Sequence, residues 1–70
     1  DWRVDDLAYA TDGGRLYVVG SEEMLVFDPA TGALTDRIFI PGNPECVVAD
    51  GERIWVGCQD GTIARYRAKP

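Results

Sequence analysis

The side chains of this chain that could do acid–base or metal chemistry are carboxylates, and two pairs of them are adjacent: Asp5 with Asp6, and Glu22 with Glu23. Two carboxylates that share a site can share a proton or bind a metal ion. Adjacent side chains of an extended chain, however, point to opposite faces of the strand. The two pairs therefore predict solvated loops or strand ends.

Four further aspartates stand where the sequence predicts turns: Asp12, Asp28, Asp50 and Asp60. An aspartate in a turn accepts a hydrogen bond from the backbone amide two residues later. We therefore expect these carboxylates to hold turns in place.

Nucleophilic and zinc chemistry lack the side chains they need. The chain has no histidine, and Ser21 is its single serine, so neither a Ser-His-Asp nor a Cys-His nucleophile can be assembled. Cys46 and Cys58 cannot complete a tetrahedral zinc site without histidine. There is no glycine-rich phosphate loop either. The sequence predicts no catalytic residues, no metal site and no cofactor.

The two cysteines are expected to be free. If Ala49 pairs with Arg53 across a turn, Cys46 faces Val56 and Cys58 faces Pro44. The two thiols are then diagonal neighbours, at or beyond the distance that a disulfide can bridge. This pairing predicts buried or half-buried free thiols.

Composition excludes two classes of partner. The net charge is −5, and seven basic residues are scattered among twelve acidic ones, whereas binding to a phosphate backbone needs clustered Lys and Arg. Nucleic acid and anionic membranes are therefore poor partners. No apolar run reaches the length of a membrane span.

The elements that must position these side chains are predicted to be β-strands. Eight glycines and four prolines break the chain into short apolar segments rich in β-branched and aromatic residues, which is typical of an all-β protein. The seven predicted strands span residues 6–10, 15–20, 24–28, 34–40, 45–49, 53–58 and 62–67.

The first three strands recur about 38 residues later, and such a period is typical of stacked repeats that cannot bury their apolar faces alone. We divide the chain into a lead-in at 1–5, a four-stranded unit at 6–44 and an incomplete three-stranded unit at 45–70. Tyr17 and Trp55 are predicted to occupy equivalent positions and to pack between units. The predicted pairs are Tyr9 with Leu16 and Ala8 with Tyr17 in the first unit, and Val48 with Ile54 and Val47 with Trp55 in the second.

Residues 15–20, 25–32 and 38–44 resemble the YVTN-type β-propeller repeat, which has an "rLYV" strand, a "V.D..TG" hairpin and a last strand closed by "G..P". The resemblance covers essentially the whole chain. It implies propeller blades of four antiparallel strands, of which about 1.75 are present. Quinoprotein-like and streptogramin-lyase-like propellers share much of this pattern. The WD-repeat family fits less well, because Phe27-Asp28 stands for its Trp-Asp and no histidine is present for its Gly-His element.

Binding surfaces of a propeller are built by the loops at the ends of its blades. Here these are the two loops after the second strands and the crossover at 41–45, which are expected to open on one face. They are polar and acidic, which favours a basic or hydroxyl-rich partner. The candidate interaction residues are Ser21, Glu22, Glu23, Asn43, Glu45, Gln59 and Asp60.

Three functional hypotheses follow. The first is a non-catalytic segment of a β-propeller that serves as a binding or protein-interaction scaffold and packs against further blades. The second is a fragment of a propeller enzyme, lactonase- or lyase-like by resemblance, whose catalytic residues lie in blades absent from this chain. The third is a chain that closes a ring by self-association. A YVTN-like protein would be extracytoplasmic and a WD-repeat-like protein cytoplasmic.

Overall fold

The computed structural model describes residues 3–10 and 14–67, and all of its regular structure is β-strand. Each predicted strand is present, and every boundary lies within one residue of its predicted position. The strands are β1 (Asp6–Ala10), β2 (Arg15–Gly20), β3 (Glu23–Asp28), β4 (Ala33–Phe39), β5 (Pro44–Asp50), β6 (Arg53–Cys58) and β7 (Ile63–Arg67).

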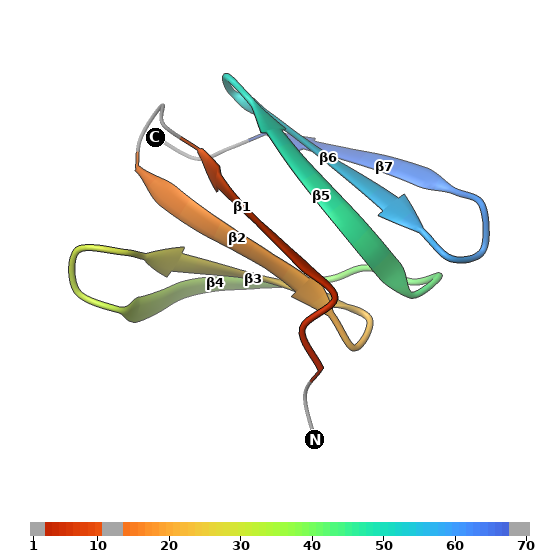
Figure 1. The fold of residues 1–70 in the computed structure, drawn as a ribbon, viewed down its shortest axis with the longest axis horizontal. Helices are drawn as coiled ribbons and strands as arrows, with labels where there is room; N and C mark the ends of the chain where they lie inside the picture. The colour runs from red at the N-terminus through yellow and green to blue at the C-terminus, as the bar shows by residue number, and fades with distance from the viewer. Residues whose placement is uncertain (1–2, 11–13, 68–70) are drawn as a thin grey trace.

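The strands form two antiparallel sheets that follow the order of the chain. The first sheet has the order β1-β2-β3-β4 and the second the order β5-β6-β7. A connection at residues 40–43 carries the chain from β4, at the outer edge of the first sheet, to β5 of the second (Figure 1). The all-β prediction is thus confirmed, with four and three strands.

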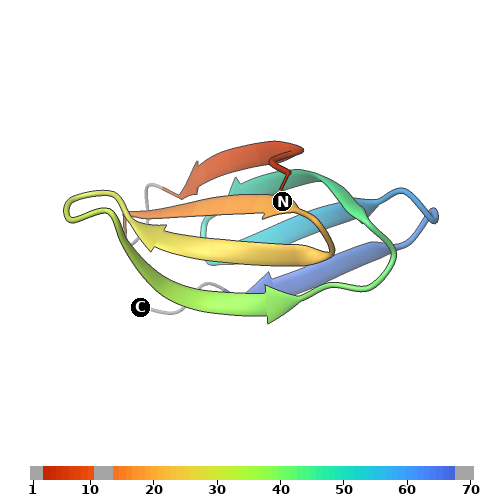
Figure 2. The ribbon, with the colours of Figure 1, turned by 90° about the horizontal axis from the view of Figure 1, so that it is seen from below.

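The two sheets pack face to face and lie closest at β1 and β5 (Figure 1). The view in Figure 2 shows them as two twisted layers. Apolar side chains from both layers fill the space between them, as expected for sheets that each bury one face. The buried cluster consists of Tyr17, Val19, Met24, Val26, Ile40, Val47, Ile54, Val56 and Cys58.

A polar contact reinforces the junction of the sheets. The Asp6 carboxylate on β1 accepts a hydrogen bond of 3.0 Å from the backbone amide of Val47 on β5. Asp6 is half-buried, whereas its neighbour Asp5 is exposed and lies 3.2 Å from the Arg3 guanidinium. The prediction that both carboxylates would simply be solvated is therefore wrong for Asp6, because the second sheet supplies a donor that the sequence does not reveal.

Register in the first sheet is as predicted, with Tyr9 opposite Leu16 and Ala8 opposite Tyr17. In the second sheet the predicted pair of Cys58 with Pro44 is present, but the predicted register between this pair and the turn is wrong by one residue. The β5–β6 turn contains two residues, Gly51 and Glu52, where we expected three. Gly51 has a φ of +60°, which suits the first position of a tight hairpin turn. The observed pairs in this hairpin are Asp50 with Arg53, Ala49 with Ile54, Val48 with Trp55, Val47 with Val56, Cys46 with Gly57 and Pro44 with Cys58.

The two sheets bury opposite faces of equivalent strands. Tyr17 on β2 points into the space between the sheets and is 3% exposed, whereas Trp55 on β6 is 38% exposed. Val56, the next residue on β6, is fully buried against the first sheet. The predicted packing of Tyr17 between the units is confirmed, but Trp55 lies on the face of the second sheet that points away from the first.

The centre of the inter-sheet core provides a test of the fold. Ile54 is completely buried, so Ile54→Ala removes three carbon atoms and leaves a cavity. We expect a loss of about 2–4 kcal/mol in the free energy of unfolding, measured by urea denaturation. The matched substitution Ile63→Ala, at a residue that is 74% exposed, should cost less than about 1 kcal/mol. Equal losses for the two variants would contradict this packing.

Candidate binding surface

Three connections of the chain meet at one end of the molecule: the β2–β3 turn, the β4–β5 connection and the β6–β7 loop (Figure 1). Backbone hydrogen bonds join them. The Ile40 amide donates to the Glu22 carbonyl at 2.8 Å, and the Gln59 amide donates to the Asn43 carbonyl at 2.8 Å. We call this group of connections, residues 20–23, 40–45 and 58–62, the loop end. The predicted meeting of these loops on one side of the molecule is present in the structure.

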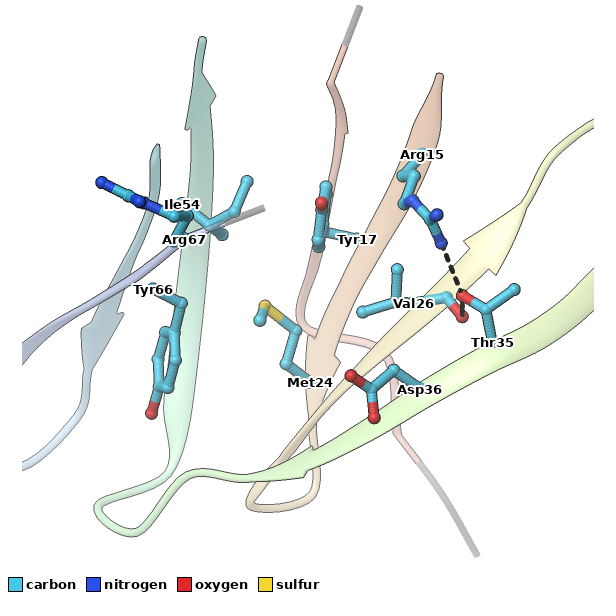
Figure 3. Close-up of a pocket in the computed structure, with 9 residues that line it drawn as sticks. All are labelled: Arg15, Tyr17, Met24, Val26, Thr35, Asp36, Ile54, Tyr66 and Arg67. Atoms are coloured by element: carbon cyan, nitrogen blue, oxygen red, sulfur yellow. Dashed lines mark hydrogen bonds between the residues drawn. The ribbon is translucent and has the colours of Figure 1, made fainter. Parts of the chain in front are cut away.

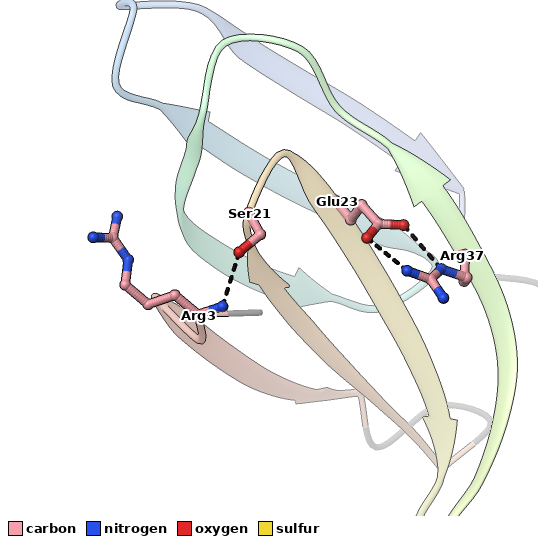
Figure 4. Close-up of polar contacts among 4 residues, drawn as sticks. All are labelled: Arg3, Ser21, Glu23 and Arg37. Atoms are coloured by element: carbon pink, nitrogen blue, oxygen red, sulfur yellow. Dashed lines mark hydrogen bonds and ion pairs between the residues drawn. The ribbon is translucent and has the colours of Figure 1, made fainter. Parts of the chain in front are cut away.

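Two residues of the β2–β3 turn have positive φ angles, which residues other than glycine seldom adopt. Ser21 has a φ of +46° and Glu22 a φ of +63°, which together correspond to a type I′ hairpin turn. The Ser21 hydroxyl accepts a hydrogen bond of 2.8 Å from the backbone amide of Arg3 (Figure 4). The turn therefore presents the exposed Glu22 side chain from a fixed backbone.

The β4–β5 connection and the β6–β7 loop hold each other. Besides the Gln59 bond, the Asp60 amide donates to the Gly42 carbonyl at 3.3 Å, and the Asn43 and Gln59 side-chain amides lie 3.5 Å apart. Gly42 has a φ of +100°, and a Cβ at this position would lie 2.8 Å from an Asp60 carboxylate oxygen. The positive φ and the neighbouring Asp60 side chain both favour glycine at this position.

Asp60 closes its own loop. Its carboxylate accepts hydrogen bonds from the Thr62 hydroxyl at 2.6 Å and from the Thr62 amide at 3.0 Å, and these bonds lower its pKa below the ordinary value. Asp28 holds the β3–β4 turn similarly, accepting a bond of 2.9 Å from the Ala30 amide. The predicted turn role is confirmed for Asp28 and Asp60, whereas Asp12 lies outside the described residues.

Glu23 lies in a strand, where the sequence predicted a turn, whereas Glu45 lies in the strand that was predicted to begin with it. Glu23 begins β3 and forms a bidentate ion pair with Arg37 on β4, with oxygen–nitrogen distances of 2.9 and 2.7 Å (Figure 4). Glu45 is the extra residue of a bulge near the start of β5, because pairing with β6 shifts between Pro44 and Cys46. The Glu23 carboxylate is thus occupied by Arg37, while Glu45 is exposed in the loop end.

A narrow cleft opens between the two sheets on the side away from β1 and β5, and the sequence did not predict it. Its volume is about 60 Å³, room for about two water molecules. Tyr17 and Met24 line one wall, and Ile54 and Tyr66 line the other (Figure 3). Burial raises the pKa of the Tyr17 hydroxyl. The cleft is too small for most organic ligands.

A β-bulge in β4 shapes the rim of this cleft. The register between β3 and β4 shifts between Val26 and Phe27, which makes Thr35 the extra residue. The Thr35 hydroxyl accepts a bond of 3.3 Å from Arg15 and donates one of 3.1 Å to the Val26 carbonyl (Figure 3). Thr35 and Asp36 break the apolar alternation of this strand, which is the one sequence signal that could have indicated the bulge.

Both cysteines are free and Cys58 is buried, as predicted. The prediction of a buried or half-buried thiol is wrong for Cys46, which is exposed because it lies on the face of the second sheet that points away from the first. Among residues 3–10 and 14–67, no three Cys, Asp or Glu side chains lie close enough together to hold a metal ion. No helix with the length and apolar character of a membrane span occurs in this part of the chain.

Comparison of the chain with known protein families, with curated proteins and with solved structures found no match.

The contact between Gly42 and Asp60 gives a test of the loop end. Gly42→Ala places a methyl group against the Asp60 carboxylate, whereas Gly32, with a φ of +77°, has open space around it. Both Ala variants pay about 1 kcal/mol for the left-handed backbone. Gly42→Ala should lose about 1 kcal/mol more than Gly32→Ala in urea denaturation, because the Asp60 side chain must move aside and lose its hydrogen bonds to Thr62. Equal losses would show that the Asp60 side chain moves aside at no cost.

The Asp60 turn predicts a pH dependence. Thr62→Val removes the hydroxyl donor, so the pKa of Asp60 should rise toward its ordinary value in an NMR titration of the side-chain carboxyl carbon, while Thr62→Ser should keep it low. Because the folded pKa of Asp60 is lowered, its ionised form stabilises the fold above the unfolded pKa, and this contribution is lost as the pH falls through the folded value. An unchanged pKa in Thr62→Val would contradict the geometry.

Proposed function

We propose that the chain forms two neighbouring blades of a β-propeller and that its loop end is a non-catalytic binding surface for a protein or small molecule that carries positive charge. The observation that supports the first part most strongly is that equivalent strands of the two sheets bury opposite faces. Two sheets related by a two-fold axis would bury the same face of each. Sheets related by a rotation much smaller than a half-turn about a common axis bury opposite faces, as neighbouring blades of a propeller do.

Strand order supports the same proposal. The chain runs through β1-β2-β3-β4 in one sheet and then returns to β5, which lies beside β1. In a propeller each blade likewise runs from the central channel outward, and the next blade starts again at the channel. In this arrangement β1 and β5 are the inner strands, and the cleft between the sheets lies toward the outer rim.

The chemistry of the loop end supports the second part of the proposal. Glu22, Glu45 and Asp60 are exposed there, and the hydrogen bonds between the loops fix the backbone that carries them. A preorganised surface loses less entropy on binding than a flexible one. Carboxylates suit Lys, Arg or an amine on the partner, and the chain's net charge of −5 favours the approach of a cation.

The test measures the binding of labelled octapeptides by fluorescence anisotropy at low salt. One peptide alternates Lys with Ser, and a second alternates Glu with Ser. We expect the basic peptide to bind and the acidic peptide not to bind. Glu22→Gln/Glu45→Gln should weaken binding of the basic peptide about fivefold, from roughly 0.5 kcal/mol for each exposed charge pair.

A matched control removes two charges at the opposite end of the sheets. Asp50 and Glu52 are exposed in and beside the β5–β6 turn, so Asp50→Asn/Glu52→Gln removes the same two negative charges without changing the loop end. This variant should bind the basic peptide as the unmodified chain does. Equal weakening by both variants would show that the peptide responds only to the net charge of the chain. If the basic peptide did not bind the unmodified chain, the proposed binding surface would be wrong.

A further inference from the structure

Each sheet packs one face against the other sheet and leaves its second face on the outside of the molecule. We propose that the outer face of the first sheet docks on the outer face of the second sheet in another copy of this chain, so that copies associate head to tail. This inference rests on the blade arrangement proposed above and adds a specific partner and contact surface. We call the first surface the leading face and the second the trailing face.

The residues of each face follow from register, because directly opposed residues of antiparallel strands share a face. None of them belongs to the buried cluster between the sheets. The leading face consists of Leu7, Leu16, Val18, Leu25, Phe27, Leu34 and Phe39. The trailing face consists of Cys46, Val48, Trp55, Ile63 and Arg65.

Each outer face is equivalent to a surface that the other sheet buries. Val18 on β2 and Val56 on β6 are equivalent central residues. Val18 lies between Leu7 and Leu25 on the leading face, whereas Val56, between Val47 and Ala64, packs against the first sheet. The leading face therefore has a row of apolar side chains across its strands that is equivalent to the row that the second sheet buries.

The trailing face shows the complementary relation. Trp55 is equivalent to Tyr17, which packs between the sheets and is 3% exposed. Trp55 lies between Val48 and Arg65 in its sheet, with the Arg65 guanidinium 5.7 Å from the centre of its ring. A trailing face placed against a leading face would thus repeat the packing of the two sheets inside one chain, in which Tyr17 and Val56 belong to the buried cluster.

Exposed apolar side chains provide the driving force. On the leading face Leu7 is 57% and Phe39 66% exposed, and on the trailing face Val48 is 57% and Ile63 74% exposed. Contiguous apolar patches of this kind are uncommon on monomers and mark interaction surfaces. Covering both faces removes this apolar area from water, which favours association.

Charge favours a head-to-tail contact over a two-fold one. The second sheet carries Arg65 on the trailing face and the directly opposed pair Arg53 and Arg67 at its end. Two trailing faces in contact would bring like charges together, which is destabilising. On the leading face the charge of Arg37 is paired with Glu23, so a contact between a leading and a trailing face brings fewer like charges together than a contact between two trailing faces. An interface between unlike faces of identical copies is heterologous and generates rings or filaments.

The experiment uses two double variants, each of which places glutamates on one face at positions that are exposed in the single chain. Leu7→Glu/Phe39→Glu blocks the leading face, and Val48→Glu/Ile63→Glu blocks the trailing face. Mass is measured by size-exclusion chromatography with light scattering over a wide concentration range. The unmodified chain should reach at least twice its mass of 7.7 kDa, and each variant alone should stay at 7.7 kDa. An equimolar mixture should form a one-to-one heterodimer, because one intact leading face then meets one intact trailing face.

Controls separate association from folding and from charge. Circular dichroism should show the same β-sheet signal for all variants. Ala30→Glu/Gln59→Glu adds two charges at exposed positions in loops, and this variant should associate like the unmodified chain. A monomeric unmodified chain, a mixture without heterodimer, or a blocked variant that still dimerises alone would overturn the proposal, the last by showing a contact between like faces. Binding of the basic peptide to a monomeric chain would leave the proposed function standing while this inference fails.

Discussion

Packing between the two sheets is the constraint on which the rest of the structure depends. Neither sheet has a second layer of its own, so each must bury an apolar face against the other. Tyr17 and Val19 from the first sheet and Ile54 and Val56 from the second form the centre of this contact, and the bond from the Val47 amide to Asp6 fixes the strands at their closest approach. The relative position of the sheets is therefore set at β1 and β5.

The geometry of the loop end follows from that position. Once β5 lies beside β1, the chain must return from β4 across the end of both sheets, and Ile40 and Pro44 are fully buried on either side of this passage. The backbone between them is pressed against the neighbouring turns. Ser21, Glu22 and Asn43 keep positive φ angles there, because surrounding hydrogen bonds hold conformations that an isolated turn would avoid.

The proposed binding surface and the proposed docking faces lie on different parts of the molecule and present different kinds of side chain. The faces of the sheets present apolar side chains in register, which suits packing against another sheet. The loop end presents carboxylates on a fixed backbone, which suits binding of a charged partner. The exposed carboxylates of the loop end, Glu22, Glu45 and Asp60, are not among the apolar side chains of the docking faces.

Local patterns in the sequence determined the number and limits of the strands, the register of the first sheet, and the turns held by Asp28 and Asp60. Such features depend on alternation and turn residues within a few positions. Tertiary structure decided the two-residue turn at Gly51, the bulge at Thr35 and the outward direction of Trp55. A slip of one residue turns every side chain of a strand to the other face, and only the opposing sheet selects which face is buried.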